Sequence, residues 1–162
     1  MPVLLDTGIL YAYYDRSDAW HKRAVGVLRA EDDGLVVPSP VLPEVDHLLG
    51  LRLGVKARLV FHDGLVEGHY FVADLPRENY SRVAELNQRS PDLELGFVDA
   101  AVVAISEALA LPRIATADRR DFKPLARALS LELMPRAGRG RTSAGEPSCR
   151  CAPTPAPPPG SR

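Results

Sequence analysis

The segment VLLDTG at residues 3–8 is the strongest local indication of how this chain folds. Its three apolar residues have the length and type of a short buried strand, and they lead directly into an acid. A helical pattern then follows from about residue 7 to residue 14. A buried strand that passes straight into a helix is typical of the units that build parallel sheets. We therefore expect an α/β fold with Asp6 at the carboxyl edge of its first strand.

The same alternation of short apolar runs and longer helical patterns continues along the chain. Strands are predicted at residues 3–6, 35–38, 70–73, 113–115 and 131–134. Helices are predicted at about 7–14, 18–31, 40–52, 54–66, 77–89, 96–110 and 119–128, several of them opened by the capping-type residues Asp18, Ser39 and Asp118. Because helices outweigh strands, both faces of the sheet should be covered. In such sheets the active site usually lies at the carboxyl ends of the strands.

Length and composition indicate one domain with a tail. The 162 residues are 46% hydrophobic and 25% charged, and no apolar stretch approaches the roughly 18 residues that would span a membrane. The segment 136–162 is rich in Pro, Arg and Gly and has almost nothing apolar to pack, so we expect a folded domain over 1–135 and a disordered tail over 136–162. Cys149 and Cys151 both lie in that tail, and a fold that needs no disulfide fits a cytoplasmic protein.

The charges are unevenly distributed along the chain. Residues 135–162 carry five Arg and one Glu, a balance of +4, so the overall charge of −1 leaves −5 on residues 1–134. An acidic body argues weakly against binding nucleic acid through bulk charge. It is easier to understand if several acids surround cations.

Two of the acids fall on apolar helix faces. Glu44 lies within about 60° of Val41 and Leu48 at 100° per residue, and Asp99 lies on the same side of its helix as Val102 and Val103. A buried carboxylate normally shifts its pKa, pairs with another group or binds a metal. For either residue alone, a salt bridge or a water-filled pocket would serve equally well.

Two further acids accompany the strand predicted at 113–115. Asp118 follows that strand and precedes a helix, where an Asp is commonly an N-cap, and Asp121 completes a pattern that resembles a capping box. Asp6 alone could likewise be only a cap. Together, however, Asp6, Glu44, Asp99 and Asp118 could converge in one acidic pocket, where bridging cations would relieve their repulsion. Oxygen ligands without Cys or a His cluster favour Mg²⁺ or Mn²⁺ over zinc.

Four segments, taken in order, resemble the four motifs of the PIN-domain family, and in particular its VapC-type ribonuclease toxins. The segments are VLLDTG at 3–8, VLPEV at 41–45, GFVDAA at 96–101 and IATADRRDF at 114–122. The resemblance covers about residues 2–134.

This resemblance implies a three-layer α/β/α fold with a five-stranded parallel sheet, and a metal-dependent endoribonuclease that leaves a 5′-phosphate and a 3′-hydroxyl. Its acidic catalytic and metal-binding quartet would be Asp6, Glu44, Asp99 and Asp118. The hydroxyls of Thr7 and Thr116 would orient these acids, and Asp121 would be a possible outer ligand. The expected cofactor is Mg²⁺ or Mn²⁺.

The resemblance also implies partners. RNA would be the substrate, and Arg119, Arg120 and Lys123 are the best candidates to contact it because they flank Asp118, although an ordinary solvated helix face is equally compatible with them. A VapB-type antitoxin would hold the chain inactive, and the chain would form a homodimer, with no membrane involved. Tyr11, Tyr13, Tyr14 and Trp20 could stack on bases, or could be core or dimer-interface residues, and His21 could be catalytic or structural.

Other readings of the acids fit less well. An aspartic protease shares the Asp-Thr-Gly string but is all-β and needs a second copy of it, and a haloacid-dehalogenase-type phosphatase needs an Asp where Gly8 stands. A receiver domain would need clustered early acids and a late Lys. The remaining alternative is a catalytically inactive PIN-like binding module that acts through protein or RNA partners.

Overall fold

The sheet occupies the centre of the molecule and all its strands are parallel. The structure, a computed structural model, describes residues 1–89 and 95–135, so the predicted tail and both cysteines lie outside the described residues. The strands are β1 (Val3–Leu5), β2 (Leu35–Pro38), β3 (Phe71–Ala73), β4 (Arg113–Ala115) and β5 (Glu132–Met134), in the order β3-β2-β1-β4-β5. The five-stranded parallel sheet is confirmed, with strand ends within one residue of those predicted.

The helices follow the predicted pattern closely. They are α1 (Thr7–Tyr14), α2 (His21–Ala30), α3 (Val41–Arg52), α4 (Val55–Val66), a 3₁₀ turn (Arg77–Asn79), α5 (Tyr80–Arg89), α6 (Gly96–Ala108) and α7 (Arg119–Leu129). Helix α2 begins three residues later than predicted, because the Asp18 carboxylate accepts a hydrogen bond from the backbone N of Trp20 (2.7 Å) in a turn before the helix. Ser39 was also expected to cap a helix, but the N-cap of α3 is Pro40, and no side chain caps this helix.

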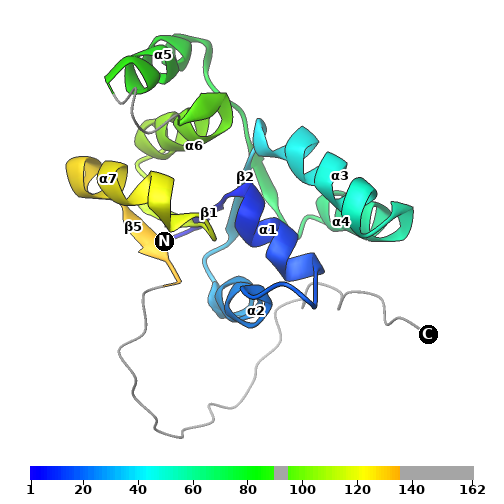
Figure 1. Cartoon of the computed structure of the whole chain (residues 1–162). Helices are drawn as coiled ribbons and strands as arrows, with labels where there is room; N and C mark the ends of the chain where they lie inside the picture. Colours follow the sequence, from blue (N-terminus) through cyan, green and yellow to red (C-terminus); the bar gives the residue numbers. More distant parts are fainter. Residues whose placement is uncertain (90–94, 136–162) are drawn as a thin grey trace, which may run out of the picture.

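Strand order determines which helices share a face. The chain moves from β1 to β2 to β3 in one direction across the sheet and then crosses back to β4 and β5 in the other. Because such crossovers are right-handed, the first direction places α1 to α4 on one face and the second places α5 to α7 on the other. Figure 1 shows this separation, with α5, α6 and α7 grouped apart from α1, α3 and α4.

The core is continuous from the central strand outward. Every residue of β1 is fully buried, and so is the run from Ala100 to Ile105 in α6. A strand in the middle of a covered sheet must be apolar on both faces, which explains why Val3, Leu4 and Leu5 do not alternate with polar residues. Among the described residues, no helix is both long enough and apolar enough to span a membrane.

A buried pair of tyrosines joins α1 to the start of β3. The hydroxyls of Tyr14 and Tyr70 lie 3.1 Å apart, and Phe61 of α4 packs against both rings. Burial raises the pKa of both phenols, to about 12 for Tyr14, so both stay neutral at ordinary pH. The hydrogen bond satisfies two polar groups that have little access to water.

Removing both of these hydroxyls should cost less than the sum of the costs of removing each one alone. We expect Tyr14→Phe and Tyr70→Phe each to lower the free energy of unfolding by about 1–2 kcal/mol, because each leaves a buried hydroxyl without its partner. The double variant should be less destabilised than the sum of the singles. Urea denaturation of the four proteins measures the difference, with Tyr80→Phe at an exposed ring as the control. Additive single effects would show that the two hydroxyls do not depend on each other.

Candidate functional site

A buried carboxylate lies at the carboxyl end of the central strand. Asp6 follows β1 and is only 4% exposed. One carboxylate oxygen, Oδ1, accepts a hydrogen bond from the backbone N of Thr7 at 2.7 Å, so Asp6 is the N-cap of α1. The other, Oδ2, accepts a hydrogen bond from Oγ1 of Thr116 at 2.8 Å. The residue is therefore a helix cap and also part of a buried polar cluster.

Thr116 holds the neighbouring strand end in register with Asp6. It is fully buried directly after β4, and its Oγ1 also accepts a hydrogen bond from the backbone N of Asp118 at 3.0 Å. One hydroxyl thus links the Asp6 side chain to the turn that begins α7. This linkage places Thr116 where an orienting residue was predicted.

Glu44 reaches the site from a different position than predicted. It was expected on the buried stripe of its helix with Leu48, but the fully buried positions of α3 are Val41, Val45 and Leu49, and Glu44 is exposed. The prediction was wrong because a residue about 60° around the helix axis from a buried position can lie at the edge of the packed face, where it is exposed to solvent. The carboxylate turns toward α1, where its Oε2 accepts a short hydrogen bond from the Thr7 hydroxyl.

The other two acids of the predicted quartet also lie at this edge of the sheet. Asp118 is the N-cap of α7, where its Oδ1 accepts a hydrogen bond from the backbone N of Arg120 at 3.0 Å. Asp99 is half-buried in the first turn of α6. Helix α6 runs back to the start of β4, so its first turn lies near the carboxyl ends of the strands.

Burial is the largest influence on the pKa of Asp6. Loss of hydration raises the pKa of its carboxyl from 3.8 to about 6. The hydrogen bonds from Thr116 and from the backbone of Thr7 lower that pKa, whereas the negative charges of Glu44 and Asp118 raise it further. These three carboxylates are therefore close enough to repel one another, which favours binding of a cation among them.

The donor set suits a hard cation that keeps much of its water. Among residues 1–89 and 95–135, no three Asp, Glu, His or Cys side chains are close enough to enclose a metal ion. Mg²⁺ is usually held by only one or two carboxylates together with water, and carboxylate oxygens are the ligands it prefers. An open group of carboxylates at Asp6, Glu44 and Asp118 is therefore compatible with a hydrated hard cation such as Mg²⁺ or Mn²⁺, and less so with an ion that needs a closed protein cage.

The basic residues next to Asp118 have different environments. Nη2 of Arg119 donates hydrogen bonds to the carbonyl oxygens of Leu133 (3.3 Å) and Pro135, so this guanidinium is tied to the end of β5. Arg120 and Lys123 are exposed on α7. The side chain of Asp121 lies outside the described part of the chain.

The early aromatic residues belong mainly to the core. Tyr13 and Tyr14 are buried, and the hydroxyl of Tyr11 donates to the Asp15 carboxylate at 2.7 Å. Nδ1 of His21 is 2.8 Å from the carbonyl oxygen of Ala12, a contact that joins α2 to α1. Of the alternatives left open for these residues, packing is the one that the structure favours.

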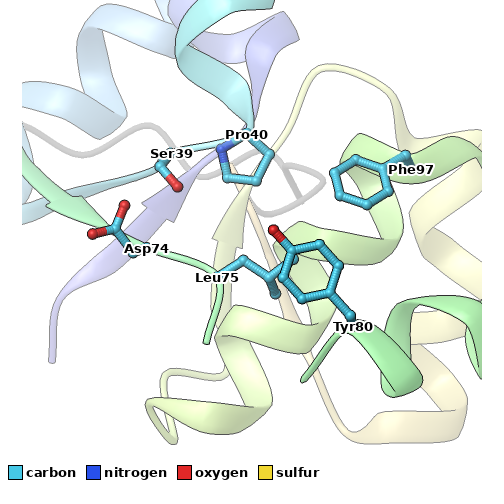
Figure 2. Close-up of a pocket in the computed structure, with 6 residues that line it drawn as sticks. All are labelled: Ser39, Pro40, Asp74, Leu75, Tyr80 and Phe97. Carbon is cyan, nitrogen blue, oxygen red and sulfur yellow. The ribbon is translucent and has the colours of Figure 1, made fainter. Parts of the chain in front are cut away.

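A pocket that the sequence did not reveal lies at the ends of β2 and β3. It measures about 400 Å³ and is shown in Figure 2. Its lining is Ser39, Pro40, Asp74, Leu75, Tyr80 and Phe97. In the sequence both aromatic residues stand in helices where large apolar side chains normally mark the core, and no signal in the pattern distinguishes exposed rings from buried ones.

Comparison with known proteins identifies relatives over most of the chain. Residues 3–128 match the family described as the PIN domain. The sequence is 30% identical over 123 residues to Ribonuclease VapC26 of Mycobacterium tuberculosis, a match that covers 76% of this chain and 91% of that protein.

Solved structures of similar fold include two from toxin systems. VapC20 of Mycobacterium tuberculosis, a toxin that cleaves the sarcin–ricin loop, superposes with a TM-score of 0.69 at 20% identity, over 75% of this chain and 94% of that one. VapBC2 of Rickettsia felis, bound to a DNA fragment from its promoter, gives a TM-score of 0.59 at 17% identity, over 82% of this chain and 97% of that one.

The buried charge of Asp6 should make the wild-type protein less stable than its amide variant. A folded-state pKa of about 6 against 3.8 in the unfolded chain means that the folded state holds the proton more tightly between these values. Stability from this group therefore falls as pH rises from about 4 to about 6, by an amount on the order of 3 kcal/mol. Asp6→Asn should unfold at higher temperature at pH 8 in EDTA, with a gain that shrinks toward pH 4.

Binding of a metal ion should stabilise the wild type relative to Asp6→Asn. Mg²⁺ or Mn²⁺ should raise the melting temperature of the wild type at pH 8, because it neutralises the buried charge, and should leave Asp6→Asn nearly unchanged. Asp63→Asn, an exposed acid on α4, is the matched control. Equal responses of wild type and Asp6→Asn to metal would remove Asp6 from any metal site.

Proposed function

Because this chain belongs to the PIN-domain family, we propose that it is a metal-dependent endoribonuclease that acts as the toxin of a toxin–antitoxin pair. The observation that carries the proposal is the buried Asp6 carboxylate, held by Thr7 and Thr116 and facing the charges of Glu44 and Asp118. A buried carboxylate without a compensating charge lowers the stability of the fold, and groups of this kind are typical of functional sites. The relationship to a protein named as a ribonuclease VapC supports a nuclease.

The proposed chemistry is hydrolysis of an RNA phosphodiester to a 5′-phosphate and a 3′-hydroxyl. When bound, Mg²⁺ or Mn²⁺ would lower the pKa of a water and neutralise charge on the leaving oxygen. Asp6, Glu44, Asp99 and Asp118 would hold the ion and its water. Thr7 and Thr116 would fix the orientation of Glu44 and Asp6 through the hydrogen bonds that they donate.

The proposed partners follow from the relatives and from charge. Similarity to a VapB–VapC complex supports a VapB-type antitoxin for this chain. The homodimer is proposed only from the family resemblance. The excess of acids over bases in residues 1–134 would suit an inhibitory segment that carries basic side chains. Arg120 and Lys123, exposed beside Asp118, remain the candidates for contact with RNA phosphates.

Cleavage of RNA tests the proposal directly. Purified, antitoxin-free protein should cut total RNA into discrete fragments with 5′-phosphates in Mg²⁺ or Mn²⁺ and not in EDTA. Asp6→Asn and Asp99→Asn should each reduce the rate by at least about 100-fold, whereas Asp63→Asn should not, because it changes charge by the same amount far from the strand ends. A folded wild type that is inert with either metal would favour the alternative, a PIN-like module that binds partners without catalysis.

Thr116 should act as a positioning residue. Thr116→Val removes a hydrogen bond that lowers the pKa of Asp6, so this pKa should rise and the acidic limb of the rate profile should move to higher pH. We also expect the maximal rate to fall by about 10-fold, the lower end of what loss of such a supporting contact costs. Thr116→Ser should restore both the rate and the profile. An unchanged profile in Thr116→Val would show that the hydroxyl only supports the fold.

A further inference from the structure

The pocket of Figure 2 lies beside the acids and not among them. Ser39 and Asp74 follow β2 and β3, and the backbone N of Ser39 donates to the carbonyl oxygen of Ala73 at 2.8 Å, which holds the two strand ends together. Tyr80 is the first residue of α5 and Phe97 the second of α6. Figure 2 shows the two rings together on one side of the pocket and Ser39 with Asp74 on the other.

The pocket adjoins the acidic site through two helices. Phe97 precedes Asp99 by two residues in the first turn of α6, and Pro40 immediately precedes α3, whose first turn carries Glu44. A strand of RNA with a phosphate at the acids would therefore bring an adjacent nucleotide to this pocket. Its volume of about 400 Å³ is in the range of small-molecule sites and is ample for one base.

Two exposed aromatic rings form one wall. Tyr80 and Phe97 are 53% and 51% exposed, and their ring centroids lie 6.3 Å apart at an angle of 37°. Exposed aromatic side chains gathered at a pocket are uncommon in a surface that has no ligand. Unpaired bases of RNA bind by stacking on such rings, whatever their sequence.

The opposite wall can select among bases. The Asp74 side chain is exposed at this wall, and within the described ranges no residue forms an ion pair with its carboxylate or donates a hydrogen bond to it. Two neighbouring N–H donors match a carboxylate best, and guanine presents them at N1 and N2. Adenine and cytosine place an acceptor nitrogen beside their amino group, and uracil places carbonyl oxygens on both sides of its single N–H; each of these acceptors would repel the carboxylate.

We propose that the pocket lined by Tyr80, Phe97 and Asp74 is a subsite for one base of single-stranded RNA next to the cleaved bond, with a preference for guanine. This inference rests on the proposed nuclease function, but the pocket's binding can be measured without cleavage. The rings would supply affinity, and Asp74 would supply the choice of base. A second copy of the chain seated on these rings is the competing occupant.

Binding should be measured in the inert Asp6→Asn background. Fluorescence anisotropy with labelled single-stranded oligonucleotides, uracil-only or with one central guanine, adenine or cytosine, gives the affinity for each base in EDTA. We expect the guanine oligonucleotide to bind most tightly. Tyr80→Leu and Phe97→Leu should each weaken binding of all four by about 10-fold, the effect of losing one stacking contact. Phe71→Leu, an equally exposed ring on β3 outside the pocket, should not change binding.

Asp74→Asn should remove the preference for guanine and keep the weaker binding that the other oligonucleotides show. Affinity for the guanine oligonucleotide should fall by about 10-fold, to the level of the others, because an amide offers one acceptor in place of two charged ones. Asp63→Asn is the charge-matched control. In the active protein, mapped fragment ends should show guanine beside the cut, and this bias should disappear in Asp74→Asn.

The outcomes separate this inference from the proposed function. Cleavage without any base bias, together with unchanged binding in the leucine variants, would overturn the subsite and leave the nuclease intact. Base-selective binding by a wild type that cleaves nothing would support the subsite and overturn the nuclease. A lower molar mass of Tyr80→Leu and Phe97→Leu by light scattering, with unchanged RNA affinity, would assign the rings to an interface between two copies.

Discussion

The hydrogen bond between the Thr116 hydroxyl and the Asp6 carboxylate is the interaction around which the site is organised. It joins the ends of β1 and β4, which are neighbours in the sheet but 110 residues apart in the chain. The same hydroxyl accepts from the backbone N of Asp118, and the same carboxylate caps α1. The positions of two helices and two strands therefore depend on a few polar atoms buried at one edge of an otherwise apolar core.

Burying the Asp6 carboxylate at this edge lowers the stability of the fold, and the hydrogen bonds to Asp6 do not fully offset that loss. Two hydrogen bonds favour the ionised form of Asp6, but loss of hydration and the charges of Glu44 and Asp118 outweigh them, so the pKa of Asp6 rises. Arg119, the basic residue that directly follows Asp118, does not compensate these charges, because its guanidinium donates to the carbonyl oxygens at the end of β5. A positive group that enters from outside would therefore stabilise the arrangement, and in the proposed function that group is a metal ion or a basic side chain of the antitoxin.

The edge of the sheet divides into two chemically different halves. Acids gather at the ends of β1 and β4, where a phosphate and its metal would be held. Beyond β2 lies the pocket with Tyr80, Phe97 and Asp74, which has exposed rings and a carboxylate without a partner among the described residues. Under the proposed function, one strand of RNA would use both halves, the first for reaction and the second for recognition of a base.

Local patterns in the sequence were enough to predict the helices and strands and the positions of Asp6 and Asp118. Buried parallel strands are short and continuously apolar, and helices have a clear period, so the ends of nearly all elements were predicted within a few residues. Asp6 and Asp118 were located because an acid that follows a strand in such a fold must lie at the carboxyl edge. The environment of Glu44 and the exposure of Tyr80 and Phe97 depend on how the helices pack in three dimensions, and the sequence pattern did not predict them. Helical periodicity shows which residues share a face, but which neighbour covers that face depends on contacts between segments distant in the chain.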